Sequence, residues 1–280
     1  MTQQALPDRV PDREARLGRA RGEERSVHGV VLLLPGGTAH SVRRRSPRAA
    51  AAVLPLARRL ARAGRGDSLV THVVHYRFHG WNGAAAHTAR DAEWAVDEVV
   101  RRYGDVPVCL LGTDVGARAA LHAAGHPAVT AVLALAPWLP GAPAEAGNAG
   151  DAGNARTAGG PPGDATRPAP AEEEPIDQLA GRQVLFVHGT DDVRTDPELS
   201  FRLAERAKRR DPGVCRFEVH SDGHTLSQHR SEVAALAEDF VLGTLGDRPF
   251  SRPLTDAFAA PPPLGLRMPL AAGFGRSLRG

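Results

Sequence analysis

Three polar residues have types and a spacing that could support nucleophilic chemistry. Asp114 lies at the centre of Gly112-Thr113-Asp114-Val115-Gly116, directly after an apolar run, and the flanking glycines favour a sharp turn that exposes the central side chain. A carboxylate is ionised at neutral pH and could attack carbon there without activation. Asp192 and His224 follow later in the chain and could supply an acid and a base.

Other residues compete for these roles. Asp191 could be the acid in place of Asp192, and either carboxylate could only cap its turn. We expect His188 to fill a structural place beneath that turn. Three side chains close to His224 complicate the choice of base, and each is expected to face solvent: His220, Asp222 and His229.

Two further groups of residues follow apolar runs. Pro35-Gly36-Gly37-Thr38 could provide a backbone N–H that completes an oxyanion hole with the N–H of Val115. Trp81, Asn82 and Trp138 could line a pocket. The alternative is that the tryptophans pack in the core and Asn82 occupies a turn.

Alternating elements must position these residues. Short apolar runs predict six strands, at 29–34, 69–76, 106–111, 130–136, 183–187 and 215–219. Helical periodicity and capping residues predict helices at 47–63, 88–103, 115–124, 197–210 and 227–242. This alternation indicates an α/β fold with a mostly parallel sheet covered on both faces, whose ligands bind beyond the carboxyl ends of the strands.

Composition divides the chain into one domain and three polar segments. Residues 1–26 are rich in arginine and acids and are expected to be disordered, as is the low-complexity insert 141–175. The domain spans 27–243, and 244–280 is expected to be a Pro-rich tail in which Phe250, Phe258 and Phe274 could dock locally. Cys109 and Cys215 lie in apolar runs and are expected to be buried free thiols. The N-terminus has no apolar signal segment, so we expect a cytoplasmic protein.

The region from Val27 to Leu242 resembles the α/β-hydrolase superfamily, particularly its short actinobacterial members. Their Gly-x-Ser-x-Gly, Gly-x-x-Asp and Gly-His signatures align with 112–116, 189–192 and 223–224. The resemblance implies that Asp114 is the nucleophile, Asp192 the acid and His224 the base. It also implies that Gly37 or Thr38 donates an N–H to the oxyanion hole with Val115. The apolar runs predict a reduced core of about six strands, and the insert 141–175 lies where the family usually has a cap, so we expect no structured cap.

Asp114 departs from the family's usual serine. Aspartate nucleophiles occur in relatives such as haloalkane dehalogenases, fluoroacetate dehalogenases and soluble epoxide hydrolases, where the carboxylate forms an ester with the substrate and histidine activates the water that cleaves it. The residue after the nucleophile here is Val115, where haloalkane dehalogenases usually have tryptophan. Tyr76 and Tyr103 do not lie where epoxide hydrolases have their two cap tyrosines.

We therefore expect a hydrolase that acts on a small organic ester, epoxide or halide through an Asp-His-Asp triad and a covalent intermediate. One alternative is a hydrolase in which Asp114 is a general base, and another is an inactive binding protein with the same fold. A small-molecule substrate is the expected partner. No cofactor, metal, nucleic acid or membrane is expected, and the oligomeric state stays open.

Overall fold

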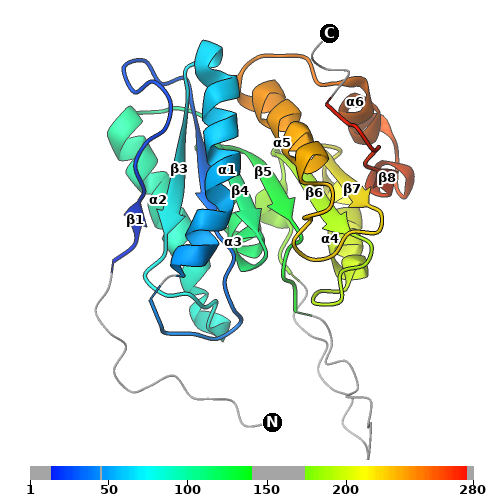
Figure 1. The fold of residues 1–280 in the computed structure, drawn as a ribbon, viewed down its shortest axis with the longest axis horizontal. Helices are drawn as coiled ribbons and strands as arrows, with labels where there is room; N and C mark the ends of the chain where they lie inside the picture. Colours follow the sequence, from blue (N-terminus) through cyan, green and yellow to red (C-terminus); the bar gives the residue numbers. More distant parts are fainter. Residues whose placement is uncertain (1–13, 45, 141–173, 276–280) are drawn as a thin grey trace, which may run out of the picture.

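The structure is a computed structural model that describes residues 14–44, 46–140 and 174–275. Residues 1–13 and 141–173, which hold most of the two segments expected to be disordered, lie outside the described residues. The order of elements is the alternation of strands and helices that the sequence predicts. Figure 1 shows the strands side by side in one sheet between helices.

Six long strands form the centre of the sheet, as predicted. They are β2 (Gly29–Leu34), β3 (Leu69–His75), β4 (Val108–Thr113), β5 (Val129–Leu135), β6 (Gln183–Gly189) and β7 (Val214–Val219). They pair in parallel in the order β3-β2-β4-β5-β6-β7. Parallel pairing brings the carboxyl ends of these strands to one edge, the lower edge of the sheet in Figure 1.

Two strands of two residues each extend the sheet to eight strands, two more than expected. β1 (Arg16–Leu17) pairs antiparallel with β3, and β8 (Met268–Pro269) pairs parallel with β7. β1 lies within the segment 1–26 that we expected to be disordered, so this expectation is wrong for residues 16–21, which pair with β3 through β1, Gly18 and Arg21. This segment is ordered because β3 would otherwise be an edge strand, whose backbone groups need hydrogen-bond partners. The segment supplies them, for example through Gly18 N, which donates to Val73 O at 2.8 Å. A polar composition does not reveal such long-range hydrogen bonds.

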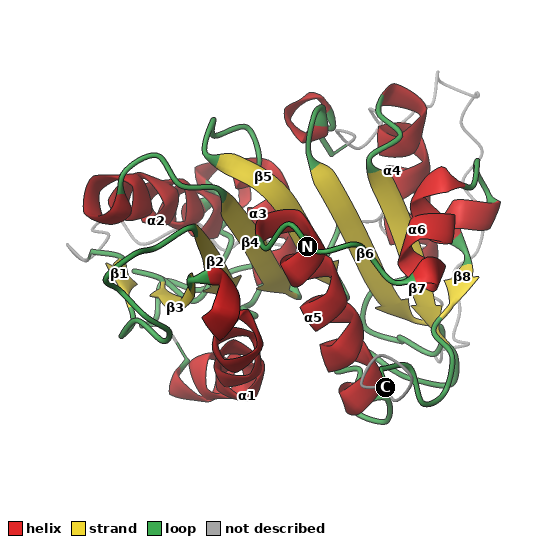
Figure 2. Cartoon of the chain, turned by 90° about the horizontal axis from the view of Figure 1, so that it is seen from above, coloured by secondary structure: helices red, strands yellow, loops and turns green. Residues whose placement is uncertain are grey.

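Five helices cover the two faces of the sheet. α1 (Pro47–Ala63) and α5 (Arg230–Leu245) lie on one face, and α2 (His87–Tyr103), α3 (Val115–Ala123) and α4 (Pro197–Arg210) lie on the other, as Figure 2 shows. Ser46 caps α1 by accepting a hydrogen bond from Ala49 N at 3.2 Å, and Pro47 is its first residue, as the sequence predicts.

The described part of the segment after residue 243 is folded onto the domain and is not only a Pro-rich tail; Phe250 and Phe258 dock there, the alternative that the sequence left open. α5 continues to Leu245, and α6 (Arg252–Ala259) follows. Phe250 and Phe258 each lie 6.5 Å from the ring of Phe240, and Leu254 is fully buried. These apolar side chains bury surface on α5, while proline near the start of α6 is compatible with a helix.

The core lies on both sides of the sheet because alternate strand residues face opposite helical layers. Val30, Leu32 and Leu34 of β2 join the cluster under α2 and α3, whereas Val31 and Leu33 join the cluster under α1 and α5. Cys109 and Cys215 are buried free thiols, as expected. Within the described ranges, no helix has the length and apolar character needed to cross a bilayer.

Candidate active site

Asp114 occupies a sharp turn between β4 and α3. Its backbone has φ 54° and ψ −122°, a conformation that a residue with a side chain rarely adopts. The flanking glycines permit this turn by letting backbone segments touch. A Cβ atom on Gly112 would lie 2.2 Å from Gly116 O, and one on Gly116 would lie 2.1 Å from Leu34 O. The strained turn places the Asp114 carboxylate at the carboxyl edge of the sheet.

The loops after β6 and β7 bring the other two candidate residues to this carboxylate. His224 Nδ1 lies 2.7 Å from Asp192 Oδ2, and His224 Nε2 lies 3.3 Å from Asp114 Oδ1. The three side chains therefore form a continuous row. Asp191, the alternative acid, instead accepts a hydrogen bond from Thr190 Oγ1 through its Oδ1.

The two oxygens of the Asp114 carboxylate have different surroundings. Oδ2 accepts hydrogen bonds from Gly37 N and from Arg194 Nη2, each at 3.3 Å. Oδ1 and the facing His224 Nε2 are both buried, and neither has a hydrogen-bond partner within the described ranges. Their 3.3 Å separation is thus an electrostatic contact without hydrogen-bond alignment. Each buried polar atom left without a hydrogen bond costs about 1–3 kcal/mol of stability. Such atoms are rare in folded proteins, and a functional site is one place where they occur.

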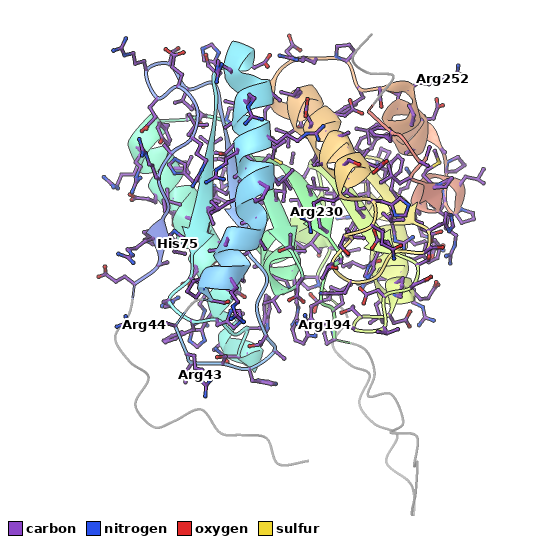
Figure 3. All side chains as sticks on the ribbon, in the orientation of Figure 1. Arg43, Arg44, His75, Arg194, Arg230 and Arg252 are labelled. Carbon is purple, nitrogen blue, oxygen red and sulfur yellow. The ribbon has the colours of Figure 1, made fainter. Side chains whose placement is uncertain are left out.

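Arg194 is a site residue that the sequence analysis missed. Its guanidinium contacts Asp114 Oδ2 and, at 3.5 Å, Gly37 O, while 53% of its side chain stays exposed. Figure 3 shows Arg194 at the lower edge of the sheet, the same edge at which Arg43 and Arg44 lie. The available signal in the sequence was its position two residues after Asp192, in the same predicted loop.

The backbone N–H groups expected to form the oxyanion hole have different hydrogen-bond partners in the structure. Gly37 N points at Asp114 Oδ2, whereas Thr38 N donates to His79 O at 3.1 Å and is therefore engaged away from the site. Of the two N–H groups expected to line the hole, that of Gly37 contacts Asp114 and that of Thr38 does not. Val115 is the first residue of α3, where an N–H group has no acceptor inside the helix.

Charge and burial together shift the pKa values of His224 and Asp192 in opposite directions. Burial lowers the pKa of His224, but the carboxylates of Asp114 and Asp192 outweigh it and raise this pKa above its usual value of 6.5. Burial also acts on Asp192, but hydrogen bonds from Thr195 N, His224 and Arg194 N hold its pKa below the usual range. An ionised Asp192 beside a readily protonated His224 is an effective arrangement for proton transfer.

The three expected pocket residues have different surroundings. Asn82 is buried, and its side chain binds Ser41 N at 2.8 Å, Gly80 O at 3.1 Å and His87 Nδ1 at 3.0 Å, contacts that fix a turn. Trp138 N donates to Asp114 O at 3.1 Å, which places this tryptophan beside the turn of the candidate nucleophile.

Trp81 belongs to a cluster that the sequence analysis did not identify. The guanidinium of Arg118 lies 3.9 Å from the centroid of Trp81 and 5.1 Å from that of Trp138. Arg118 also forms an ion pair with Glu174, and His122 Nε2 lies 2.7 Å from the same carboxylate. Glu174 therefore attaches the end of the insert to α3 through contacts with two α3 side chains. The composition of the insert does not predict these contacts.

Metal-ligating side chains and cysteine thiols are the other groups in the described residues that could support chemistry. No group of three or more His, Cys, Asp or Glu side chains that could hold a metal ion occurs in the part of the chain that the structure describes. Cys109 and Cys215 are fully buried, and burial raises the pKa of both thiols, which makes them poor nucleophiles.

Comparison with solved structures identifies the fold. TT1662 from Thermus thermophilus is 18% identical with a TM-score of 0.55, and the match covers 84% of this chain and 100% of that one. The esterase Pf2001 from Pyrococcus furiosus is 12% identical with a TM-score of 0.52, covering 84% and 92%. The carboxylesterase CesB from Bacillus subtilis is 17% identical with a TM-score of 0.50, covering 85% and 93%.

These proteins resemble the chain in structure and not in amino-acid sequence. No protein-family model matches the sequence, and no curated protein does so either. The mostly parallel sheet with helices on both faces is consistent with the α/β hydrolases among these structural neighbours. This chain has the α/β-hydrolase fold.

Proposed function

We propose that the protein is a hydrolase that forms a covalent ester between Asp114 and its substrate. One observation carries this proposal: the two oxygens of the Asp114 carboxylate are differentiated. Oδ2 is held by Gly37 N and Arg194, whereas Oδ1 is buried, has no hydrogen-bond partner among the described residues and faces His224 Nε2. A carboxylate oxygen that accepts no hydrogen bonds is the better nucleophile, because hydrogen-bond donors stabilise its negative charge and make its electron pair less available to the substrate.

In the first step, Asp114 Oδ1 attacks a saturated carbon of the substrate. A C–O bond forms, the bond from that carbon to the leaving group breaks, and the leaving group keeps the electron pair. An alkyl halide or an epoxide fits this step. Attack on a carboxylic ester would give an anhydride, so we place esters below these two classes.

In the second step, His224 Nε2 takes a proton from water, and the resulting hydroxide attacks Cγ of the Asp114 ester. The charge that develops on Oδ2 is stabilised by Gly37 N–H and the Arg194 guanidinium, which already bind that oxygen. Collapse breaks the C–O bond formed in the first step. The alcohol leaves with the proton that His224 returns, and the Asp114 carboxyl group releases the remaining water proton to solvent, which regenerates the carboxylate.

The charges of the row explain how His224 can serve as a base although its pKa is raised. Before reaction, the carboxylates of Asp114 and Asp192 both favour the imidazolium. Ester formation removes the charge of Asp114, so the pKa of His224 falls just when a neutral imidazole is required. Asp192 keeps its charge and continues to orient Nδ1.

The test combines a substrate screen with isotope labelling. The purified full-length protein is assayed against haloalkanes, haloacids, epoxides and p-nitrophenyl esters, with Asp114→Asn as the matched control. For a substrate that turns over, a single turnover is run in water enriched in the heavy oxygen isotope. We expect the label in the Asp114 carboxylate and not in the first product, because water attacks Cγ.

The opposite distribution would contradict the covalent route. A labelled product with an unlabelled enzyme means that water attacks the substrate directly, with Asp114 as the general base. Absence of turnover together with ligand binding that Asp114→Asn leaves intact means a binding protein.

A further inference from the structure

A second histidine contacts the acid of the row. His188 lies in β6 and is fully buried, and its Nε2 is 3.0 Å from Asp192 Oδ2, the oxygen that also contacts His224 Nδ1 at 2.7 Å. The other oxygen, Asp192 Oδ1, accepts hydrogen bonds from Arg194 N at 2.8 Å and Thr195 N at 3.0 Å. Both oxygens of Asp192 therefore have two partners, and His188 is one of them.

A buried chain of polar groups continues behind His188. Its Nδ1 lies 2.8 Å from Ser200 Oγ, and Arg216 Nε donates to the same hydroxyl oxygen at 3.1 Å. Arg216 Nη2 donates to Pro197 O at 3.2 Å, and Nη1 pairs with Glu218 at 2.7 Å. His188, Ser200 and Arg216 are each at most 1% exposed. Buried polar groups of this kind are costly unless every donor has an acceptor.

The acceptors determine where the protons lie. An ionised carboxylate only accepts hydrogen bonds, so the nitrogens that face Asp192 Oδ2 must both carry hydrogen: His188 Nε2 and His224 Nδ1. Burial lowers the pKa of His188 to about 4, against the opposing effect of Asp192, so its imidazole is neutral at neutral pH. Its Nδ1 is then bare and accepts the hydroxyl proton of Ser200.

Arg216 allows the Ser200 hydroxyl to donate toward His188 in this chain of hydrogen bonds. Ser200 Oγ also lies 2.8 Å from Pro197 O, so its single proton has two possible acceptors. Because Arg216 Nη2 also donates to Pro197 O, that carbonyl keeps a hydrogen bond when the Ser200 proton is directed at His188 Nδ1. The guanidinium therefore orders the proton positions from Arg216 through Ser200 and His188 to Asp192.

We propose that His188 is a positioning residue of the site: backed by Ser200 and Arg216, it donates a fixed hydrogen bond to Asp192 Oδ2 and shares that oxygen with His224. Two consequences follow. The carboxylate of Asp192 is held in the orientation that keeps the proton of His224 on Nδ1 and leaves Nε2 directed at Asp114. Because His188 takes part of the charge on Oδ2, Asp192 stabilises the His224 imidazolium less than a carboxylate with one histidine would.

This inference concerns the geometry of Asp192 and His224, and it holds whichever reaction the site performs. The charged groups that bear on it are few. Asp192, Arg216 and His224 face His188, while Asp114 and Asp192 face His224. The proposal can therefore be tested by NMR of the imidazole nitrogens in the full chain, without a substrate.

The wild-type spectrum is the first measurement. We expect His188 to be neutral at neutral pH, with hydrogen on Nε2 and a bare Nδ1, and to titrate only near the value of about 4. Hydrogen on Nδ1 with a bare Nε2, or an imidazolium at neutral pH, would overturn the proposal. This measurement requires no variant and so does not depend on a variant's folding.

Two variants then distinguish the effect of the hydrogen bond that His188 donates from the effect of its volume in the core. His188→Leu removes the donor, and His188→Gln keeps an N–H near the position of Nε2. We expect His188→Leu to raise the pKa of His224 by about one unit, since Asp192 Oδ2 regains its full charge toward His224. His188→Gln should leave that pKa close to the wild-type value. An unchanged or lowered pKa in His188→Leu, or an equal rise in both variants, would show that His188 only fills space.

Discussion

Asp114 Oδ1 and His224 Nε2 lie 3.3 Å apart, yet both atoms are buried and neither forms a hydrogen bond with a described residue. Native structures rarely leave two polar atoms unsatisfied against each other, because each omission costs free energy. The cost is tolerated where the two atoms are used by the reaction itself. In the proposed reaction Oδ1 forms the bond to the substrate carbon, and Nε2 takes the proton of the hydrolytic water.

Strain at Asp114 should be measurable as stability. Asp114→Gly and Asp114→Ala both remove the carboxylate, but only glycine adopts the positive φ of 54° without steric cost. We expect Asp114→Gly to have a free energy of unfolding about 1 kcal/mol higher than Asp114→Ala. Denaturant unfolding of the two variants measures this difference. Equal stability, or a more stable alanine variant, would show that the turn is not strained.

Arg194 should act on the second chemical step. Arg194→Met removes the cation that binds Asp114 Oδ2, so the ester should hydrolyse more slowly by about tenfold to a hundredfold and accumulate on the enzyme. Rapid-quench mass spectrometry measures the lifetime of the adduct. Arg194→Lys should restore part of the rate, and Arg252→Met, which changes an exposed arginine of α6, is the matched control. An adduct lifetime equal to that of the wild type would remove Arg194 from the mechanism.

The pKa of His224 should depend on the charge of Asp114. Asp114→Asn removes one of the two carboxylates that raise this pKa, so NMR titration should show it fall. Asp191→Asn is the matched control, because that carboxylate binds Thr190 and should leave His224 unchanged. A pKa that does not move in Asp114→Asn would mean that the contact between Asp114 and His224 is electrostatically negligible.

The same shift has a consequence for stability. A histidine with a raised pKa in the folded state contributes stability that is fully present below its usual value of 6.5 and is lost as the pH rises through the folded pKa. We therefore expect this contribution in wild-type protein to disappear at a higher pH than in Asp114→Asn. Unfolding curves over the neutral and mildly alkaline range measure the difference. Superimposable pH dependences would contradict the linkage.

The glycine pair of the turn should be intolerant of a methyl group. Gly116→Ala would place a Cβ 2.1 Å from Leu34 O and 2.5 Å from Pro35 O, backbone atoms that cannot move without shifting β2. We expect a loss of about 3 kcal/mol in the free energy of unfolding. Gly66→Ala is the control, because its Cβ would meet nothing closer than Arg248 Nη2 at 3.8 Å. A Gly116→Ala variant as stable as the control would mean that the turn relaxes easily.

Local signals in the sequence were sufficient for the framework of the molecule. The apolar run of β2 and the Ser-Pro start of α1 predict the elements that the structure contains, because periodicity and capping are local properties. The edge strands β1 and β8 were missed for the opposite reason. Each is two residues long and is defined by hydrogen bonds to a partner strand far away in the chain.

The candidate site shows the same division between local and long-range information. Sequence by itself determined that Asp114 lies in a glycine-bounded turn and that Asp192 and His224 follow later strands, since these are matters of residue type and order. Only the tertiary structure decided that Asp192 rather than Asp191 contacts His224, that Arg194 and Gly37 bind Asp114 Oδ2, and that His188 shares Asp192. Those contacts join loops from different strands, and their partners depend on side-chain directions that the packed sheet imposes.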